Sequence, residues 1–174
     1  MARSRLKAAL PACLVAFMAP ALIGASGSFD SFESRVLAVH NLERRQLGIE
    51  PLHWDAALAA SAQRWADRLA ASGRFEHAPR DGAAPQGENL WAGTSGYFSV
   101  ESMVGAWTRE KRFFREGAFP NNSVTGEVSD VGHYTQVIWR ATREVGCARA
   151  RGEEMDILVC RYAEPGNYIG ERPF

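Results

Sequence analysis

The chain has 174 residues, of which 46% are hydrophobic, and its 20 Lys and Arg equal its 20 Asp and Glu in number. This length suits one domain with one sizeable core. Without an excess of positive charge, the chain has neither the basic footprint that nucleic acid requires nor a polybasic patch for a membrane surface. We therefore expect no nucleic acid among its partners.

The first 25 residues predict a signal peptide. Three positive charges in the first seven residues precede an uncharged, mostly apolar stretch from Ala8 to Ile23, and small residues follow it. The alternative is a transmembrane anchor, but the stretch is short for a span of about 20 residues and two prolines interrupt it. We expect residues 1–25 to be removed and residues 26–174 to form a single domain, with 17 Lys and Arg, 20 Asp and Glu and a net charge of −3. We expect this mature form to have no transmembrane anchor and to be secreted or periplasmic.

Two helices are predicted next, over residues 31–47 and 55–71. At the first, Ser31 or Asp30 can accept a hydrogen bond from the unpaired N–H groups of the opening turn. Apolar residues recur at helical spacing in both segments, and a glycine follows each of them. The alanine-rich faces of the second helix allow close packing, so we expect it to lie deep in the fold.

Residues 75–96 are rich in Gly, Pro, Asn and Asp and sustain no period, which predicts an irregular segment. A loop of this length in a compact domain is usually functional or disordered, and His77, Glu88 and Trp91 within it favour a function. The next predicted segments are a helix over residues 99–115, an irregular stretch over 116–132 and a short helix or turn over 132–139.

Two apolar runs, Val145–Ala150 and Met155–Tyr162, flank a turn-like segment and predict a hairpin with one cysteine in each strand. Cys13 leaves with the signal peptide, so Cys147 and Cys160 form an even pair in an oxidising compartment. A disulfide closing this 14-residue loop would stabilise the fold by about 3 kcal/mol; the alternative is two buried thiols. Three helices and a small antiparallel sheet between them predict an α+β fold, a three-layer α-β-α sandwich.

Few residues outside the predicted helices and strands are candidates for catalysis or metal binding. The chain has no His-Glu-x-x-His, Gly-x-Ser-x-Gly, P-loop or Cys-x-x-Cys motif, and its four histidines are at positions 40, 53, 77 and 133. We interpret His40 and His53 as structural. His77 and His133 lie in or beside irregular stretches, as does Glu88. Spacing alone does not bring these side chains together, and by spacing they are solvated loop residues.

Five segments of the chain carry a recognisable pattern. They are Gly132-His133-Tyr134-Thr135-Gln136-Val137-Ile138-Trp139, Leu158–Tyr168, His40-Asn41 with Arg44 and the following Pro51-Leu52-x-Trp54, Gly87-Glu88-Asn89, and Val145-Gly146-Cys147-Ala148. By these segments, which follow one another along the chain in the family's order over about Phe32 to Tyr168, the chain resembles the CAP superfamily (cysteine-rich secretory proteins, antigen 5, pathogenesis-related 1; also called SCP domains).

The resemblance implies an α-β-α sandwich with a large cleft that two histidines and two acidic residues line. By position these are His77, Glu88, Glu110 and His133. Such a set suits Zn²⁺ or another divalent cation, because neutral imidazoles bind it and carboxylates can ligate directly, through water, or orient a histidine. Two histidine ligands leave open positions, so the expected cation is exchangeable. The alternative is a hydrogen-bonded network that rigidifies the cleft without a metal.

For function, the resemblance implies a secreted binding protein that takes a lipid, such as a sterol or fatty acid, or a partner protein. The aromatic-rich segments 91–98 and 113–119 could supply an apolar groove, or they could belong to the core. The alternative is a metal-assisted or Ser/Thr-type hydrolase in the same cleft, with His133 and Glu110 as the catalytic pair and Ser129 or Thr135 near in sequence. A third possibility is a structural module of the cell envelope. We expect binding more than catalysis.

Overall fold

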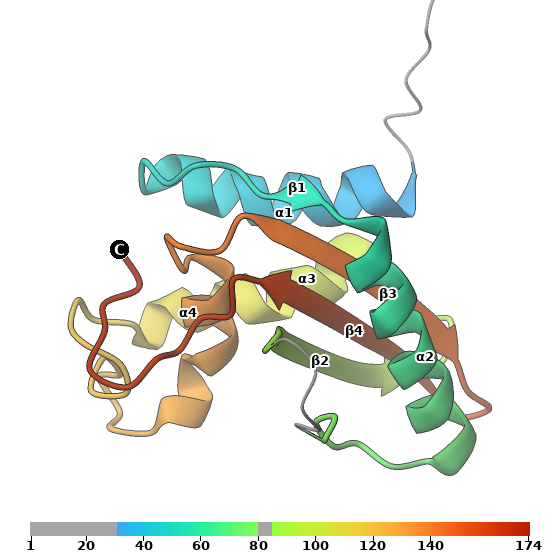
Figure 1. The fold of residues 1–174 in the computed structure, drawn as a ribbon. Helices are drawn as coiled ribbons and strands as arrows, with labels where there is room; N and C mark the ends of the chain where they lie inside the picture. Colours follow the sequence, from blue (N-terminus) through green and yellow to red (C-terminus); the bar gives the residue numbers. More distant parts are fainter. Residues whose placement is uncertain (1–30, 80–84) are drawn as a thin grey trace, which may run out of the picture.

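The computed structural model describes residues 31–79 and 85–174, so the predicted signal peptide, residues 1–25, lies outside the described residues. Figure 1 shows the arrangement of the helices and strands. The helices are α1 (Phe32–Gln46), α2 (Ala56–Ser72), α3 (Val100–Thr108), η1 (Arg109–Phe113), η2 (Val128–Asp130) and α4 (Gly132–Val137), of which η1 and η2 are 3-10 helices. The strands are β1 (His53–Trp54), β2 (Gly87–Thr94), β3 (Glu144–Arg151) and β4 (Met155–Ala163).

The long helices begin where the sequence predicts. The side chains of Ser31, Asp55 and Ser99 accept a hydrogen bond from the backbone N–H three residues on, at the starts of α1, α2 and α3. Gly73 ends α2 with a φ of 67°, a left-handed conformation that glycine adopts without strain. The predicted third helix changes to the tighter η1 after Thr108, and this 3-10 turn carries Glu110.

The four strands form one mixed sheet in the order β1-β3-β4-β2. The predicted hairpin is confirmed as β3 and β4, β2 lies antiparallel to β4, and the two-residue β1 pairs parallel with β3. The prediction of an irregular segment over residues 75–96 is wrong for its second half, where Gly87–Thr94 forms β2. Gly and Asn disfavour strands, and pairing with β4 along the whole of β2 overrides that local preference.

Each face of the sheet packs against its own helices, which confirms the three-layer α-β-α sandwich. Successive side chains of a strand point to opposite faces, so in β4 Val159 packs toward α2 while Leu158 and Cys160 pack toward α1, α3 and α4. Figure 1 shows α2 in front of the sheet and α3 behind it. A Cβ at Gly146 would collide with the backbone of Ala59, so this glycine allows α2 to lie directly on β3.

The predicted disulfide is confirmed between Cys147 and Cys160, which lie directly opposite each other on β3 and β4. Both cysteines belong to the buried cluster on the α1 and α3 face of the sheet. The bond therefore joins the two central strands from within the core.

A buried guanidinium joins α1 to the segment that follows α4. Arg44 is fully buried and donates hydrogen bonds to four backbone carbonyls, those of Glu50, Val137, Trp139 and Thr142. Burial lowers the pKa of Arg44 to about 10, so the side chain is still charged at neutral pH. These bonds fix the C-terminal end of α4, the helix that carries His133.

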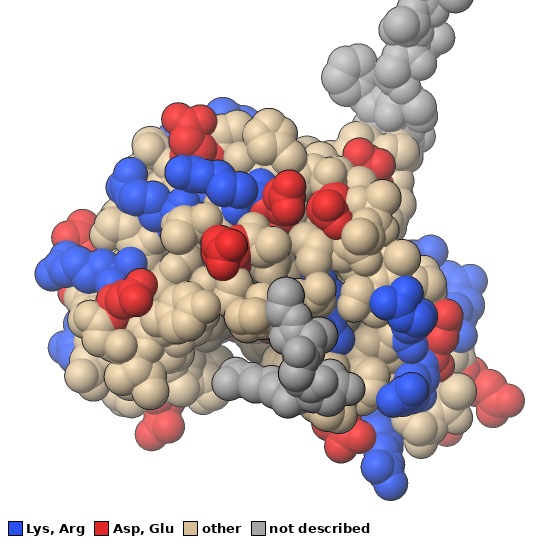
Figure 2. All heavy atoms as spheres, viewed as in Figure 1, with Lys and Arg blue, Asp and Glu red and all other residues tan. Residues whose placement is uncertain are grey.

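The face of the molecule in Figure 2 has Lys and Arg side chains interspersed with Asp and Glu side chains. Within residues 31–79 and 85–174, no helix has the length and apolar character needed to span a membrane.

Candidate functional site

A cleft of about 280 Å³ lies where β2, η2, α4 and three irregular segments meet. Of the four residues that the resemblance implies, His77, Glu88 and His133 line this cleft. Glu110 lies behind His133 and contacts it directly. The fold thus gathers the four side chains into two His–Glu pairs around one cavity.

The His133 pair is held on several sides. Glu110 Oε1 lies 2.6 Å from His133 Nδ1, and Glu110 Oε2 accepts hydrogen bonds from the backbone N–H groups of His133 at 3.1 Å and Tyr134 at 3.0 Å. The imidazole stacks on the Trp107 indole with an interplanar angle of 16° and ring centroids 6.1 Å apart. Trp107 in turn donates its indole N–H to the carbonyl of Leu90. His133 therefore has little freedom to rotate.

The His77 pair combines a firmly held carboxylate with a loosely held imidazole. Glu88 Oε1 lies 2.5 Å from His77 Nδ1 and accepts the Ala78 N–H at 3.1 Å. Its Oε2 lies 2.9 Å from Arg161 Nη2 on the neighbouring strand, although no described residue donates a well-aligned hydrogen bond to that oxygen. The side chain of His77 is 64% exposed, against 34% for His133.

Both pairs leave the same nitrogen available. Each glutamate occupies Nδ1, and no residue of the described chain hydrogen-bonds to Nε2 of His77 or His133. A carboxylate on one ring nitrogen fixes the tautomer and raises the basicity of the other nitrogen, which is the usual arrangement behind a metal-binding histidine. Within the described residues, however, no group of three or more His, Cys, Asp or Glu lies close enough to hold a metal ion. The glutamates thus support the histidines from behind and do not complete a cluster themselves.

The other two histidines lie away from the cleft. His40 is fully buried, and burial lowers its pKa to about 4, so it is neutral at physiological pH. His53 is exposed on β1 at the edge of the sheet.

The hydroxyl groups proposed for a hydrolase differ in position. Ser129 lines the cleft, but no hydrogen bond joins it to His133 within the part of the chain that is described. Thr135 is fully buried, and its hydroxyl can donate its one hydrogen to Asn167 Oδ1 at 2.6 Å or to Gly132 O at 3.1 Å. Its hydroxyl is therefore used within the fold.

Four lining residues of the cleft were not among the predicted site residues: Asn89, Val128, Gly132 and Asn167. Phe119, which also lines the cleft, ends the aromatic-rich segment 113–119 that was expected to supply an apolar groove. Asn89 follows Glu88 in the Gly87-Glu88-Asn89 segment that carries part of the family resemblance, so the sequence did contain a signal for it. The resemblance implied a site role only for Glu88. Arg161, which pairs with Glu88, stands opposite it in the β2–β4 register. No feature of a single sequence identifies that register.

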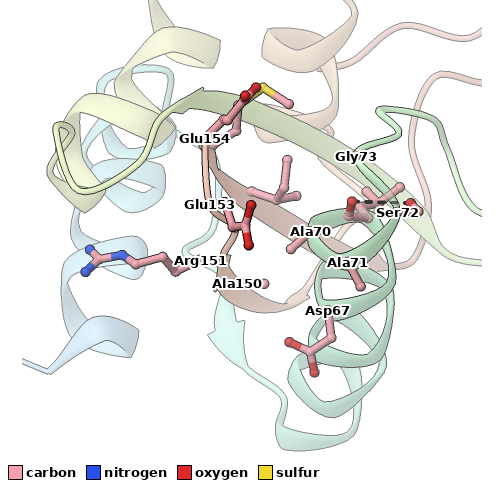
Figure 3. A pocket seen from close by; sticks show the side chains of 13 residues that line it. Asp67, Ala70, Ala71, Ser72, Gly73, Ala150, Arg151, Glu153 and Glu154 are labelled. Carbon is pink, nitrogen blue, oxygen red and sulfur yellow. Dashed lines mark hydrogen bonds between the residues drawn. The ribbon is translucent and has the colours of Figure 1, made fainter.

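A larger cavity of about 690 Å³ lies elsewhere, between the end of α2 and the turn that joins β3 to β4. Figure 3 shows Asp67, Glu153 and Arg151 among its lining side chains. None of the four implied site residues lies there, so size alone does not identify the chemically interesting cavity.

Comparisons with known proteins agree with this fold. A family model described as the cysteine-rich secretory protein family (CAP) matches residues 37–162. Pathogenesis-related protein 1A of Nicotiana tabacum is 39% identical over 139 residues, covering 79% of this chain and 78% of the relative. Pathogenesis-related leaf protein 4 of Solanum lycopersicum is 40% identical over 139 residues, covering 79% of this chain and 80% of the relative.

Solved structures show the same fold at lower sequence identity. A structure described as NaASP2 with Zn²⁺ superposes with a TM-score of 0.69 at 20% identity, covering 82% of this chain and 84% of that one. Venom allergen-like protein 4 of Schistosoma mansoni superposes with a TM-score of 0.65 at 20% identity, covering 83% of this chain and 94% of that one.

Proposed function

This chain belongs to the cysteine-rich secretory protein (CAP) family, and we propose that it is an exported binding protein whose cleft takes a divalent cation reversibly between His77 and His133. One observation carries the proposal: both imidazoles that line the cleft have Nδ1 occupied by a glutamate. This leaves two Nε2 atoms as donors of the kind that Zn²⁺ accepts. The Zn²⁺ named for the structural neighbour makes it the first cation to test.

Two protein ligands leave coordination positions for water or for a ligand's own donor atoms. The cation would then be exchangeable and would serve as a polar anchor for whatever the cleft binds. Because a cation must displace the proton from an imidazole, acidification is expected to weaken binding.

The test is a calorimetric titration of the purified, metal-free protein with Zn²⁺. H133A and H77A should each lose measurable affinity, and H53A, which removes an exposed histidine away from the cleft, should bind as the wild type does. Wild-type protein that takes up no Zn²⁺, or cleft variants that bind as tightly as H53A, would refute the proposal.

Export is part of the same proposal. It rests on the charge and apolar pattern of residues 1–25 and on a family described as secretory. N-terminal sequencing of protein recovered outside the cytoplasm should give a chain that begins near residue 26; a chain that keeps Met1 would overturn the predicted cleavage.

A lipid is a second candidate ligand, favoured by the apolar rim of the cleft. Phe119 and Val128 line the cavity, and Val128 is 38% exposed. The Gly170 N–H donates to Phe119 O at 2.8 Å, so the segment that carries the exposed Ile169 contacts the backbone of Phe119. An apolar rim around a polar centre suits an amphipathic molecule such as a fatty acid or sterol, or an apolar side chain of a partner protein.

The structure gives less support to a wider aromatic groove. The ring centroids of Trp91 and Phe98 lie 5.0 Å apart, and both rings pack against the buried core. Phe114 packs on Tyr134.

The lipid hypothesis is tested with labelled fatty acid and sterol, which should be retained by the wild type and lost from V128D. Equal retention by both proteins, or none across a lipid panel, would remove the lipid hypothesis.

A further inference from the structure

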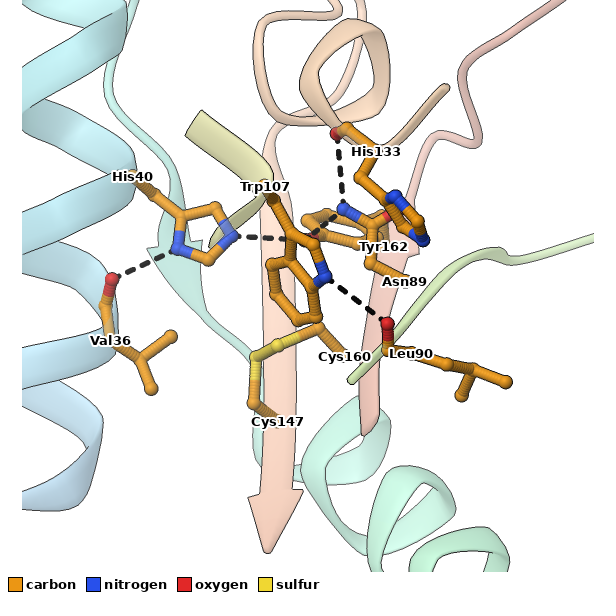
Figure 4. The surroundings of a disulfide bond; sticks show 9 residues. All are labelled: Val36, His40, Asn89, Leu90, Trp107, His133, Cys147, Cys160 and Tyr162. Atoms are coloured by element: carbon orange, nitrogen blue, oxygen red, sulfur yellow. Dashed lines mark hydrogen bonds between the residues drawn. A yellow bond between two sulfur atoms is a disulfide. The ribbon is translucent and has the colours of Figure 1, made fainter. Parts of the chain in front are cut away.

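A buried chain of hydrogen bonds runs from α1 through β4 to β2 and ends at the cleft (Figure 4). We propose that this chain orients Asn89 so that its side-chain oxygen is a third donor to the bound cation, beside His77 and His133. The inference rests on the proposed function and assigns it a further binding residue.

The direction of the chain follows from its first member. Val36 O is a carbonyl and can only accept, so His40 Nδ1, 2.9 Å away, must carry the hydrogen. His40 is neutral because it is fully buried, and its Nε2 is therefore an acceptor. Tyr162 OH lies 2.9 Å from that Nε2, so the phenol donates its hydrogen to His40.

The phenol oxygen is then left as an acceptor for Asn89. Asn89 Nδ2 donates to Tyr162 OH at 3.2 Å and to the backbone carbonyl of His133 at 3.1 Å. Since the His133 carbonyl has no hydrogen to give, the amide nitrogen and not the amide oxygen must face these two groups. Both amide hydrogens are thus committed to the protein interior.

The amide oxygen is the part of Asn89 that remains for the cleft. Asn89 lines the cavity although the residue is only 2% exposed. Its Oδ1 has no hydrogen-bond partner among residues 31–79 and 85–174. The fully enclosed side-chain atoms without a partner do not include Asn89 Oδ1, so this oxygen retains some exposed surface. The small surface that Asn89 keeps therefore presents a fixed oxygen to the cavity.

This oxygen fits the gap in the cation site. Two imidazoles line the cleft together with Glu88, whose Oε1 already contacts His77 Nδ1 and the Ala78 N–H. No group of three or more His, Cys, Asp or Glu among the described residues is placed to hold a cation. An amide carbonyl oxygen is also a cation ligand, and divalent cations accept mixed nitrogen and oxygen ligands. The same amide also holds the His133 backbone, so one residue positions one ligand and supplies another.

The test titrates the metal-free protein with Co²⁺ and records visible absorption, which reports the number and type of ligands as well as affinity. N89L, which removes both amide functions at similar volume, should weaken binding by about 10–100-fold and change the band shape. N89D keeps a side-chain oxygen but loses both N–H donors. It should therefore bind Co²⁺ at least as tightly as the wild type if Asn89 is a ligand, and as weakly as N89L if it is only structural.

Y162F tests the chain of hydrogen bonds, since it removes the acceptor of one Asn89 N–H. We expect it to bind Co²⁺ about 10-fold more weakly than the wild type. Its matched control is Y134F, which also removes a buried phenol. The Tyr134 hydroxyl donates to Glu43 at 3.2 Å and takes no part in the hydrogen bonds that lead to Asn89. Should N89L fail to fold, N89D and Y162F decide the question.

Wild-type affinity and spectrum in both N89L and N89D, or equal behaviour of Y162F and Y134F, would overturn this inference while H133A still lost binding. No Co²⁺ uptake by the wild type would instead overturn the proposed function together with the inference.

Discussion

The two halves of the cleft use the same pair of residue types and hold them in opposite ways. On the α4 side the histidine is fixed: His133 stacks on Trp107 and its backbone bonds to Glu110 and Asn89. On the other side the carboxylate is fixed: Glu88 lies on β2 beside Arg161, while His77 is 64% exposed on an irregular segment.

This difference shows how a cleft can combine affinity with adaptability. A ligand that binds first at His133 meets a group whose orientation is already set, so little conformational entropy is lost. His77 can then move onto the ligand, because only its contact with Glu88 and its backbone connections restrain it among the described residues. Four predictions, in decreasing order of expected effect, test the two halves of the cleft and the buried His40 outside it.

The largest effect is expected for Glu88. E88A removes the carboxylate that pairs with Arg161, whose side chain is only 13% exposed, and should lower the free energy of unfolding by about 3–5 kcal/mol. Urea denaturation measures the change. The matched control is E76A, whose glutamate pairs with Arg74 at 3.6 Å at the surface and should change stability by less than about 0.5 kcal/mol. Equal effects of E88A and E76A would contradict a fixed carboxylate on this side.

His40 is fully buried with no carboxylate beside it among the described residues, and we expect it to cause a pH dependence of stability. Its pKa in the folded protein is lowered to about 4 from 6.5, so the unfolded chain takes up a proton first as the pH falls. Stability from this group is complete above about pH 6.5 and decreases by about 3 kcal/mol as the pH falls to about 4. Urea denaturation over this range should show a shallower decrease for H40Q than for the wild type. Parallel curves would show that His40 is not held neutral.

Glu110 is expected to have the next largest effect. E110A removes the acceptor of the His133 and Tyr134 N–H groups and should lower the free energy of unfolding by about 2 kcal/mol. E110Q retains one acceptor oxygen and should lose roughly half as much. Thermal and urea denaturation compare the variants. An E110Q protein as unstable as E110A would show that the charge, and not the backbone contacts, holds α4.

The smallest effect compares the histidines directly. H133A should lower the free energy of unfolding by about 1 kcal/mol, because it removes the contact with Trp107. H77A should stay within about 0.5 kcal/mol of the wild type, because most of that side chain is already in water. Equal losses in urea denaturation would remove the distinction between a fixed and an adjustable half.

The parts of the fold that the sequence predicted depend on local signals. Ser31, Asp55 and Ser99 are caps that each act within one helical turn, and the β3–β4 hairpin has a short connection. β2 was not predicted, because its Gly-Glu-Asn start is typical of a loop and becomes strand only through pairing with β4 about 70 residues later.

The candidate site has the same dependence on distant contacts. His77 and Glu88 are 11 residues apart and Glu110 and His133 are 23 apart, so no helical or strand period relates them. The family resemblance supplied these four residues. It did not supply Asn89, whose orientation depends on Tyr162 in another strand and on His40 in α1.

The strand order carries a consequence for the timing of assembly. β3 and β4 occupy the middle of the sheet, and β1 and β2 each contact the sheet only through them. During synthesis, a nascent chain that has not reached Glu144 has two edge strands with nothing to pair with, and α2 has no surface to cover. Its apolar residues stay unassembled until residues 144–163 emerge, since the sheet requires the central hairpin. The strand order therefore delays assembly of the whole sandwich until the β3–β4 hairpin has been synthesised.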